Sequence, residues 1–176
     1  MIKGEKIALS AIEENELKTL MDWRNIPSFR KHFREYRELN MTMQKKWFKK
    51  INQDNSIYMF SIKRLEDNKL LGCCGLTYID WKNRNADLSL YIGYNNLYID
   101  KKGYAREASL LLFEYGFEEL NLHKIWTEIY EYDDKKLNLY KKIGFKEDGR
   151  LRDNNYFDGK WWDSIMLSIL KNEYLS

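Results

Sequence analysis

The amino-acid sequence predicts an α+β protein in which helices cover a mixed sheet. Two observations indicate this class. Apolar and polar residues alternate in about seven segments, as in half-buried strands, and apolar residues recur at helical spacing in about four others. The order of these segments is a strand, two helices, three strands, a helix, a strand, a helix and two strands. Because runs of strands are not separated by regular helices, the pattern favours a mixed sheet over a purely parallel one.

The N-terminal half contains the first strand, two helices and a three-stranded meander. Pro27, the only proline, is expected to end the first helix, and a polar, arginine-rich connection follows it. Thr42 is a suitable N-cap for the second helix. The turn residues Glu66-Asp67-Asn68 favour a hairpin. The expected elements are strand 6–12, helix 13–25, helix 42–53 and strands 56–65, 69–78 and 86–93.

The C-terminal half contains two helices and three strands. Asp133 or Asp134 is expected to cap the second of these helices, and Gly144 closes it. Asp158-Gly159 forms the turn of a final hairpin. The expected elements are a helix from Gly103 to Leu120, strand 124–132, a helix ending at Ile143, and strands 149–156 and 162–170.

Composition limits the classes of function. The chain of 176 residues is expected to form a single domain, 1–176, and 30 basic against 27 acidic residues argue against nucleic-acid binding. No segment is apolar enough for a signal peptide or membrane span, so we expect a cytoplasmic protein with no membrane partner. Cys73 and Cys74 are adjacent in a strand, point to opposite faces and are expected to be inert. His32 and His123 have no ligand neighbours, so no metal site is expected.

The segment Asp100-Lys-Lys-Gly-Tyr-Ala-Arg-Glu-Ala108 lies between a strand and a helix. A turn of this kind binds phosphate, because the free N–H groups and the positive dipole end of the helix point to one place. Gly103 lets a ligand approach the backbone, and Lys101 and Lys102 add positive charge. An ordinary strand-to-helix turn is the structural alternative.

Three motifs in this order resemble the GNAT superfamily of acetyl-CoA-dependent N-acetyltransferases over nearly the whole chain. Lys102-Gly103-Tyr104-Ala105 is similar to its pyrophosphate loop, and Tyr140-Lys-Lys-Ile-Gly-Phe145 to its Tyr-x-x-x-Gly-Phe signature. Asp158-Gly159-Lys160, with Asp163 and Met166, resembles the closing hairpin of members that acetylate ribosomal-protein amino termini and amino sugars. Trp23-Arg24-Asn25 and Trp47-Phe48 are similar to members acting on nucleotide-linked amino sugars. The resemblance implies a mostly antiparallel sheet with a splayed central strand pair.

The resemblance implies that acetyl-CoA is the co-substrate. The chain departs from the family pattern at Asp100, where Gln or Arg is usual, and at Asp133, where Asn is common. Main-chain amides do not depend on side-chain identity, so the expected cradle for the diphosphate remains. The expected cofactor-binding residues are Leu90, Tyr91, Ile92, Lys101, Lys102, Gly103, Tyr104, Ala105, Arg106, Asn138 and Tyr140, with the first three supplying amides for the carbonyl oxygen.

Acetyl transfer to an amine also needs an acid and a base. The resemblance points to Tyr140 as the acid that protonates the leaving thiolate, and a core tyrosine is the structural alternative. Asp87, acting directly or through a water, is the first candidate for the base that deprotonates the ammonium, and Glu128 is the second. Either carboxylate could instead be a solvated surface group.

The acceptor is expected to be a small-molecule amine or a peptide. Arginines interleaved with aromatic residues between 28 and 41 suit a nucleotide-linked amino sugar, because guanidinium groups bind phosphate and rings stack on bases. A protein amino terminus is the alternative acceptor, and a non-catalytic acyl-CoA sensor is the alternative class. The resemblance also allows a homodimer. The expected acceptor-binding residues are Arg24, Arg30, Arg34, Tyr78 and Trp81.

Overall fold

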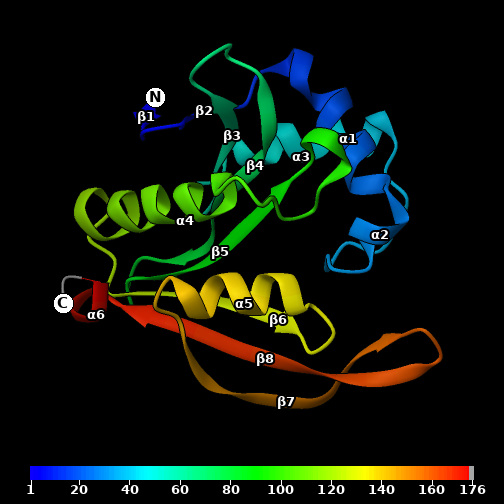
Figure 1. Ribbon diagram of the computed structural model, residues 1–176, viewed down its shortest axis with the longest axis vertical. Helices are drawn as coiled ribbons and strands as arrows, with labels where there is room; N and C mark the ends of the chain where they lie inside the picture. The colour runs from blue at the N-terminus through cyan, green and yellow to red at the C-terminus, as the bar shows by residue number, and fades with distance from the viewer. Residues whose placement is uncertain (175–176) are drawn as a thin grey trace.

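The computed structural model describes residues 1–174 and shows one eight-stranded sheet with helices on both faces (Figure 1). The strands are β1 (Ile2–Lys3), β2 (Ile7–Ala11), β3 (Tyr58–Arg64), β4 (Leu70–Asp80), β5 (Asn85–Ile92), β6 (Lys124–Tyr130), β7 (Lys146–Phe157) and β8 (Lys160–Leu170). They lie in the order β1-β2-β3-β4-β5-β6-β8-β7. Neighbouring strands are antiparallel except β5 and β6, which are parallel. The expected mixed, mostly antiparallel sheet is confirmed.

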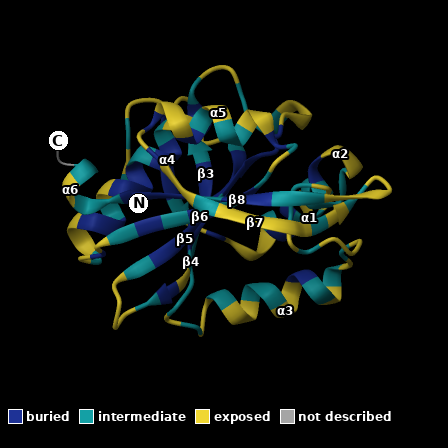
Figure 2. Ribbon diagram, turned by 90° about the horizontal axis from the view of Figure 1, so that it is seen from below, coloured by how far each residue is buried: buried dark blue, intermediate teal, exposed yellow. Residues whose placement is uncertain are grey.

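Two helices cover each face of the sheet. The helices are α1 (Leu17–Asn25), α2 (Pro27–Arg30), α3 (Met41–Ile51), α4 (Tyr104–Glu114), α5 (Asp134–Lys142) and α6 (Lys171–Tyr174). Figure 2 shows α4 and α5 on one side of the sheet and α3 on the other, where α1 also packs. Within residues 1–174, none of these helices has the length and apolar character needed to cross a membrane.

The alternation of side chains along the central strands produces two separate cores. Leu90 of β5 and Cys74 of β4 belong to the cluster under α4 and α5, whereas Tyr91 and Cys73 belong to the cluster under α1 and α3. The two cysteines therefore point to opposite faces, as the sequence predicts. Burial raises the pKa of the Cys73 thiol to about 12, which keeps it protonated and unreactive.

Three local features differ from the sequence-based expectations. The short edge strand β1 was not expected, because two residues cannot display a period. Pro27 ends α1 as expected but also occupies the first turn of α2, where its fixed φ suits a helix. The N-cap of α3 is Asn40 rather than Thr42, since the Asn40 side chain accepts a hydrogen bond from the N–H of Met43 (3.0 Å).

The turns predicted after α5 and between β7 and β8 are present, and each contains a glycine with a positive φ. Gly144 follows α5 with a φ of +105°, and Asp158 and Gly159 connect β7 to β8 with φ values of +52° and +79°. Asp133, the first of the two proposed caps, accepts a hydrogen bond from the N–H of Lys136 (3.2 Å) and begins α5. This helix carries Tyr140 toward the centre of the sheet.

Candidate active site

The parallel strands β5 and β6 separate at the centre of the sheet. They pair over only three residues each, and the last pair is Asp87 with Trp126. Just beyond it, the hydroxyl of Thr127 donates to the carbonyl of Leu88 (3.2 Å), which replaces a ladder hydrogen bond with a side-chain bond. The expected splayed pair is therefore present, and the backbone of β5 after Leu88 faces an opening.

One amide of β5 points into this opening. The N–H of Ile92 points away from β4 and donates to the carbonyl of Tyr98 (3.0 Å). Because N–H directions alternate along a strand, the N–H of Leu90 points to the same side, and that of Tyr91 points toward β4. Of the three residues expected from the sequence, Leu90 has the geometry to donate to a carbonyl oxygen in the opening.

Tyr140 lies in the core on the α4 and α5 side of the sheet. Its side chain is completely buried, and its hydroxyl has no hydrogen-bond partner among residues 1–174. Burial, together with the negative charges of Asp133 and Asp87, raises its pKa well above that of an ordinary tyrosine. The hydroxyl therefore stays protonated, and an unpaired buried donor is free to serve a bound ligand.

Asp87 lies at the base of the opening, with its side chain on the opposite face of the sheet from Leu88. The residue is 3% exposed, and its Oδ2 accepts hydrogen bonds from Arg34 Nη1 (2.7 Å) and Thr77 Oγ1 (3.4 Å). Burial raises the pKa of the carboxyl, although the positive charge of Arg34 opposes the rise. A raised pKa makes Asp87 a stronger base than a solvated carboxylate.

Both carboxylate oxygens of Glu128, the second candidate base, already accept hydrogen bonds. Its Oε1 accepts hydrogen bonds from Ser164 Oγ (2.6 Å) and Asn154 Nδ2 (3.0 Å), and its Oε2 accepts one from Arg34 Nε (3.2 Å). Arg34 thus bridges the two candidate carboxylates and anchors the 31–39 segment to β5 and β6. With both oxygens occupied, Glu128 is better suited to hold Arg34 and the β7–β8 hairpin than to accept a proton.

The loop before α4 has the form of an anion site. Gly103 adopts a φ of +89°, and a Cβ built at this residue meets no atom within 4 Å. The carboxylate of Asp100 accepts hydrogen bonds from the N–H groups of Lys102 (2.7 Å), Tyr104 (3.0 Å) and Ala105 (2.8 Å). These amides were expected to bind a diphosphate, and here a carboxylate takes the place of that anion.

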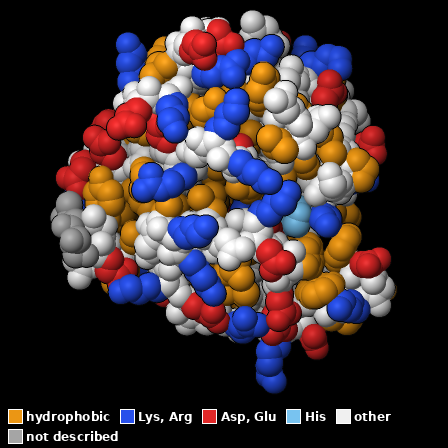
Figure 3. Space-filling model, in the orientation of Figure 1, with side chains coloured by type: hydrophobic (Ala, Val, Ile, Leu, Met, Phe, Trp, Pro, Cys, Tyr) orange, Lys and Arg blue, Asp and Glu red, His pale blue; other side chains and the backbone are white. Residues whose placement is uncertain are grey.

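The remaining cofactor candidates surround this loop. Lys101, Lys102 and Arg106 are exposed near the N-terminus of α4, and Asn138 is exposed on α5. Figure 3 shows that Lys and Arg side chains gather on the face that carries α4 and α5. The open space at Gly103 and the orphaned hydroxyl of Tyr140 fit a ligand with a diphosphate at one end and a sulfur at the other, as in CoA.

A cleft of about 690 Å³ lies on the other side of the opening, toward α1 and α3. Asp87, Glu128 and Tyr130 line its inner end, and α3 contributes residues including Lys46 and Lys50. The cleft therefore meets the splayed strands from the side opposite Tyr140. We refer to it as the acceptor cleft.

Three of the five residues that the sequence suggested for acceptor binding line the acceptor cleft, and two do not. Arg24, Arg34 and Tyr78 line the acceptor cleft, whereas Arg30 and Trp81 do not. Arg30 binds Glu38 (2.8 Å), and the Trp81 Nε1 donates to the carbonyl of Asn55 (3.1 Å), so both side chains are engaged elsewhere.

A buried cluster beside the cleft was missed by sequence reasoning. His32 stacks on Tyr98 (ring centroids 4.5 Å apart), and its Nδ1 lies 3.4 Å from Asp133 Oδ2. Burial lowers the pKa of His32 to about 4, and burial also lowers the pKa of Lys136 to about 8. Since His32 is 101 residues from Asp133, no local pattern shows the pairing. Among the described residues, no group of three or more His, Cys, Asp or Glu side chains could hold a metal ion.

Comparisons with known proteins agree with this geometry. A profile of the acetyltransferase (GNAT) domain matches residues 9–166. The uncharacterized N-acetyltransferase p20 of Bacillus licheniformis is 28% identical over 97% of this chain and 96% of its own. The spermidine N(1)-acetyltransferase of Vibrio cholerae is 29% identical over 98% of both chains. A crystal structure of the Vibrio spermidine N-acetyltransferase with CoA and spermine superimposes with a TM-score of 0.88 at 26% identity, covering 97% of this chain and 99% of that one. The chain belongs to the GNAT family of acetyltransferases.

Proposed function

We propose that the protein transfers the acetyl group of acetyl-CoA to a primary amine bound in the acceptor cleft. The observation that carries this proposal is the placement of Tyr140 and Asp87 on opposite sides of one opening in the sheet. A protonated, unpartnered hydroxyl lies on the α4 and α5 side, and a carboxylate with a raised pKa lies on the cleft side. Acyl transfer to an amine needs an acid and a base in this arrangement.

In this proposal, a different group of the protein carries out each part of the reaction. Bound acetyl-CoA supplies a thioester carbonyl that is open to attack by an amine. The amides at the N-terminus of α4 hold the diphosphate once Asp100 has released them. Asp87 accepts a proton from the ammonium group, which gives the nitrogen its lone pair. The N–H of Leu90 donates to the carbonyl oxygen as it gains charge, and Tyr140 protonates the departing sulfur.

The acceptor is a small-molecule amine in this proposal. The likeness to the Vibrio enzyme, which is named for spermidine, supports a small-molecule amine rather than a protein as the acceptor. The nucleotide-linked amino sugar and the protein amino terminus expected from the sequence have no support among the relatives named above. The expected homodimer also remains a proposal, and sedimentation at micromolar concentration tests it.

Release of free thiol from acetyl-CoA, measured across a panel of amines with mass spectrometry of the products, tests the proposed activity. We expect turnover with at least one amine and a mass increase of one acetyl group in that amine. Tight binding of acetyl-CoA without turnover on any amine would instead favour the acyl-CoA sensor.

A further inference from the structure

We propose that the acceptor amine of this enzyme also carries an anionic group, a phosphate or a carboxylate, and that lysines of α3 bind it. This inference rests on the proposed function and names the class of its substrate. Charged side chains line the acceptor cleft. Six side chains are basic and four are acidic, an excess of two positive charges: Arg24, Arg34, Arg37, Lys46, Lys50 and Lys136 against Glu35, Asp54, Asp87 and Glu128.

The arginines of the 31–39 segment are occupied by internal partners. Arg34 binds Asp87 (2.7 Å) and Glu128 (3.2 Å), and Arg37 binds Glu35 (2.6 Å). These two arginines therefore contact three of the four acidic groups, and the pair Asp87 and Glu128 shares a single positive charge. The arginines that the sequence suggested for phosphate binding are therefore not free for it.

Lys136 interacts electrostatically with Asp133 and Asp87, so the cations that remain are on α3 and at the end of α1. Within residues 1–174, Lys46, Lys50 and Arg24 form no salt bridge, and the Nε of Arg24 is buried without a hydrogen-bond partner. The fourth carboxylate of the cleft, Asp54, accepts hydrogen bonds from the N–H (2.9 Å) and hydroxyl (2.6 Å) of Ser56, and these bonds, with a smaller contribution from the positive charge of Lys50, lower its pKa. The cleft thus presents unpaired positive charge away from Asp87.

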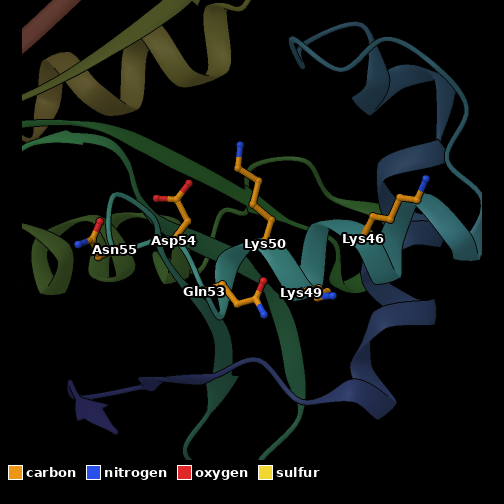
Figure 4. A pocket seen from close by; sticks show the side chains of 6 residues that line it. All are labelled: Lys46, Lys49, Lys50, Gln53, Asp54 and Asn55. Atoms are coloured by element: carbon orange, nitrogen blue, oxygen red, sulfur yellow. The ribbon is translucent and has the colours of Figure 1, made fainter.

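The two lysines are placed to act together. Lys46 and Lys50 are four residues apart and so share one face of α3. Figure 4 shows their side chains extending to the side of the helix on which Asp54 lies, while Lys49 points elsewhere. Both lysines also line a second, shallow hollow of about 620 Å³, together with Lys49, Gln53, Asp54 and Asn55. The acceptor cleft therefore continues past these lysines to open solvent, with room for a bulky anionic group.

A polyamine fits this charge distribution poorly. One ammonium group can meet Asp87, whose Oδ1 accepts no hydrogen bond within the described residues. A further ammonium group on the α3 side of the cleft approaches Lys46 and Lys50, and contacts between like charges are unfavourable. An amine with an anionic group instead finds a carboxylate at one end of the cleft and cations at the other.

Thiol release with matched pairs of acceptors tests the proposal. Ethanolamine against O-phosphoethanolamine isolates the phosphate, butylamine against 4-aminobutyrate isolates the carboxylate, and spermidine represents the polyamines. We expect the anionic member of at least one pair to have a kcat/KM at least tenfold above that of its neutral partner and above that of spermidine. The pair that shows the effect identifies the anionic group.

The double variant Lys46→Gln/Lys50→Gln supplies the structural test. We expect it to raise KM for the anionic acceptor about tenfold or more, with kcat and the affinity for CoA unchanged, because both lysines lie away from the reacting atoms. Lys45→Gln is the matched control, since it removes the same charge from the same helix at a residue that lines neither the acceptor cleft nor the adjoining hollow. It should leave KM within about twofold of the original value.

Two results would overturn the inference: spermidine as the best acceptor, or an anionic preference that survives the double variant. Failure of the proposed function looks different. If no amine is acetylated, calorimetry with O-phosphoethanolamine still measures the anion site, and binding that is lost in the double variant supports that site alone. Absence of both turnover and binding contradicts the inference as well.

Discussion

The carboxylate of Asp100 accepts hydrogen bonds from the same main-chain amides that we expect to bind the diphosphate of CoA. Its carboxylate accepts three hydrogen bonds at the N-terminus of α4, so the side chain must leave before a phosphate can enter. The family pattern has Gln or Arg at this position, and neither supplies a competing anion. We therefore expect Asp100 to stabilise the loop of the free protein and to oppose binding of the cofactor.

The variant Asp100→Asn should bind CoA about five- to tenfold more tightly, because the neutral amide competes less well for the N–H groups. The free protein should lose about 1 kcal/mol of stability, because hydrogen bonds to a charged carboxylate are stronger than those to a neutral amide. Isothermal titration calorimetry measures the first effect and thermal unfolding the second. Acetyl-pantetheine lacks the diphosphate, so its affinity should not change. Weaker CoA binding in the variant would mean that Asp100 assists the cofactor.

Gly103→Glu should abolish CoA binding, because the new carboxylate would project into the open space where the diphosphate is expected and would repel it. The φ of +89° also costs a non-glycine residue about 1–2 kcal/mol. Gly103→Ala carries the same backbone cost without the bulk or the charge, and it should retain binding. Equal CoA affinity in the Glu variant and the wild type would contradict the assignment of the loop.

Tyr140→Phe should lower kcat by a factor of roughly 10² to 10⁴ while leaving the dissociation constant of CoA within about twofold. The hydroxyl makes no hydrogen bond in the free protein, so its removal should not reduce the free energy of unfolding. Thiol-release kinetics and thermal melts give both values. Tyr115→Phe, at a half-buried ring that packs on Phe60, is the control. Full activity of the Tyr140 variant would exclude the acid role.

At the scale of single residues, the sequence motifs pointed to candidate site residues but not to the side chains that those residues contact in the folded protein. The turn before a helix pointed to Gly103, and the family resemblance pointed to Tyr140 and Asp87, which the structure places on opposite sides of one opening. The partners of Arg34 and His32 were not found, because Glu128 and Asp133 are about 100 residues away in the chain. Which arginines remain free for a ligand depends on such contacts, so the sequence alone could not show that Arg34 is held by two carboxylates.

The elements that build the site are β5, β6 and the 31–39 segment. The strands separate after Asp87, and Arg34 and His32 fasten the segment over the resulting cleft. Strands and helices with a clear period were predicted within a few residues of their observed bounds. The elements that were missed, β1, α2 and α6, span two to four residues, which is too short for a period to appear.

The attachment of the 31–39 segment should make stability depend on pH. The folded pKa of His32 is about 4, below the value of about 6.5 expected in the unfolded chain. Between these values only the unfolded chain binds the proton, so stability falls as pH drops from 6.5 toward 4, by up to about 3 kcal/mol. Burial causes the shift, and Lys136, Lys31 and Lys135 strengthen it against the opposing charge of Asp133.

His32→Gln removes this titration. Denaturant unfolding at pH 7 and pH 5 should show a loss of stability about 2 kcal/mol smaller in the variant than in the wild type. The only other histidine, His123, is exposed, and His123→Gln should keep the wild-type pH dependence. An unchanged pH dependence in His32→Gln would show that His32 is not buried in its neutral form.

At the scale of the whole molecule, the sheet separates two ligand sites and the opening joins them. The α4 and α5 side carries the loop and Tyr140, and the α1 and α3 side carries the acceptor cleft. The order of elements along the chain was sufficient to predict a mixed sheet, and the family motifs predicted the splayed pair and the acetyltransferase family, both of which are confirmed. The charge of the cleft arises only from the folded arrangement.

A crystal structure of the protein with bound CoA tests the central claim most directly. We expect the diphosphate to lie about 3 Å from the amides of residues 102–106, with Asp100 turned away from them. The thiol should lie beside the Tyr140 hydroxyl, in the opening between β5 and β6. A diphosphate bound elsewhere, or a thiol that does not reach this opening, would contradict the account.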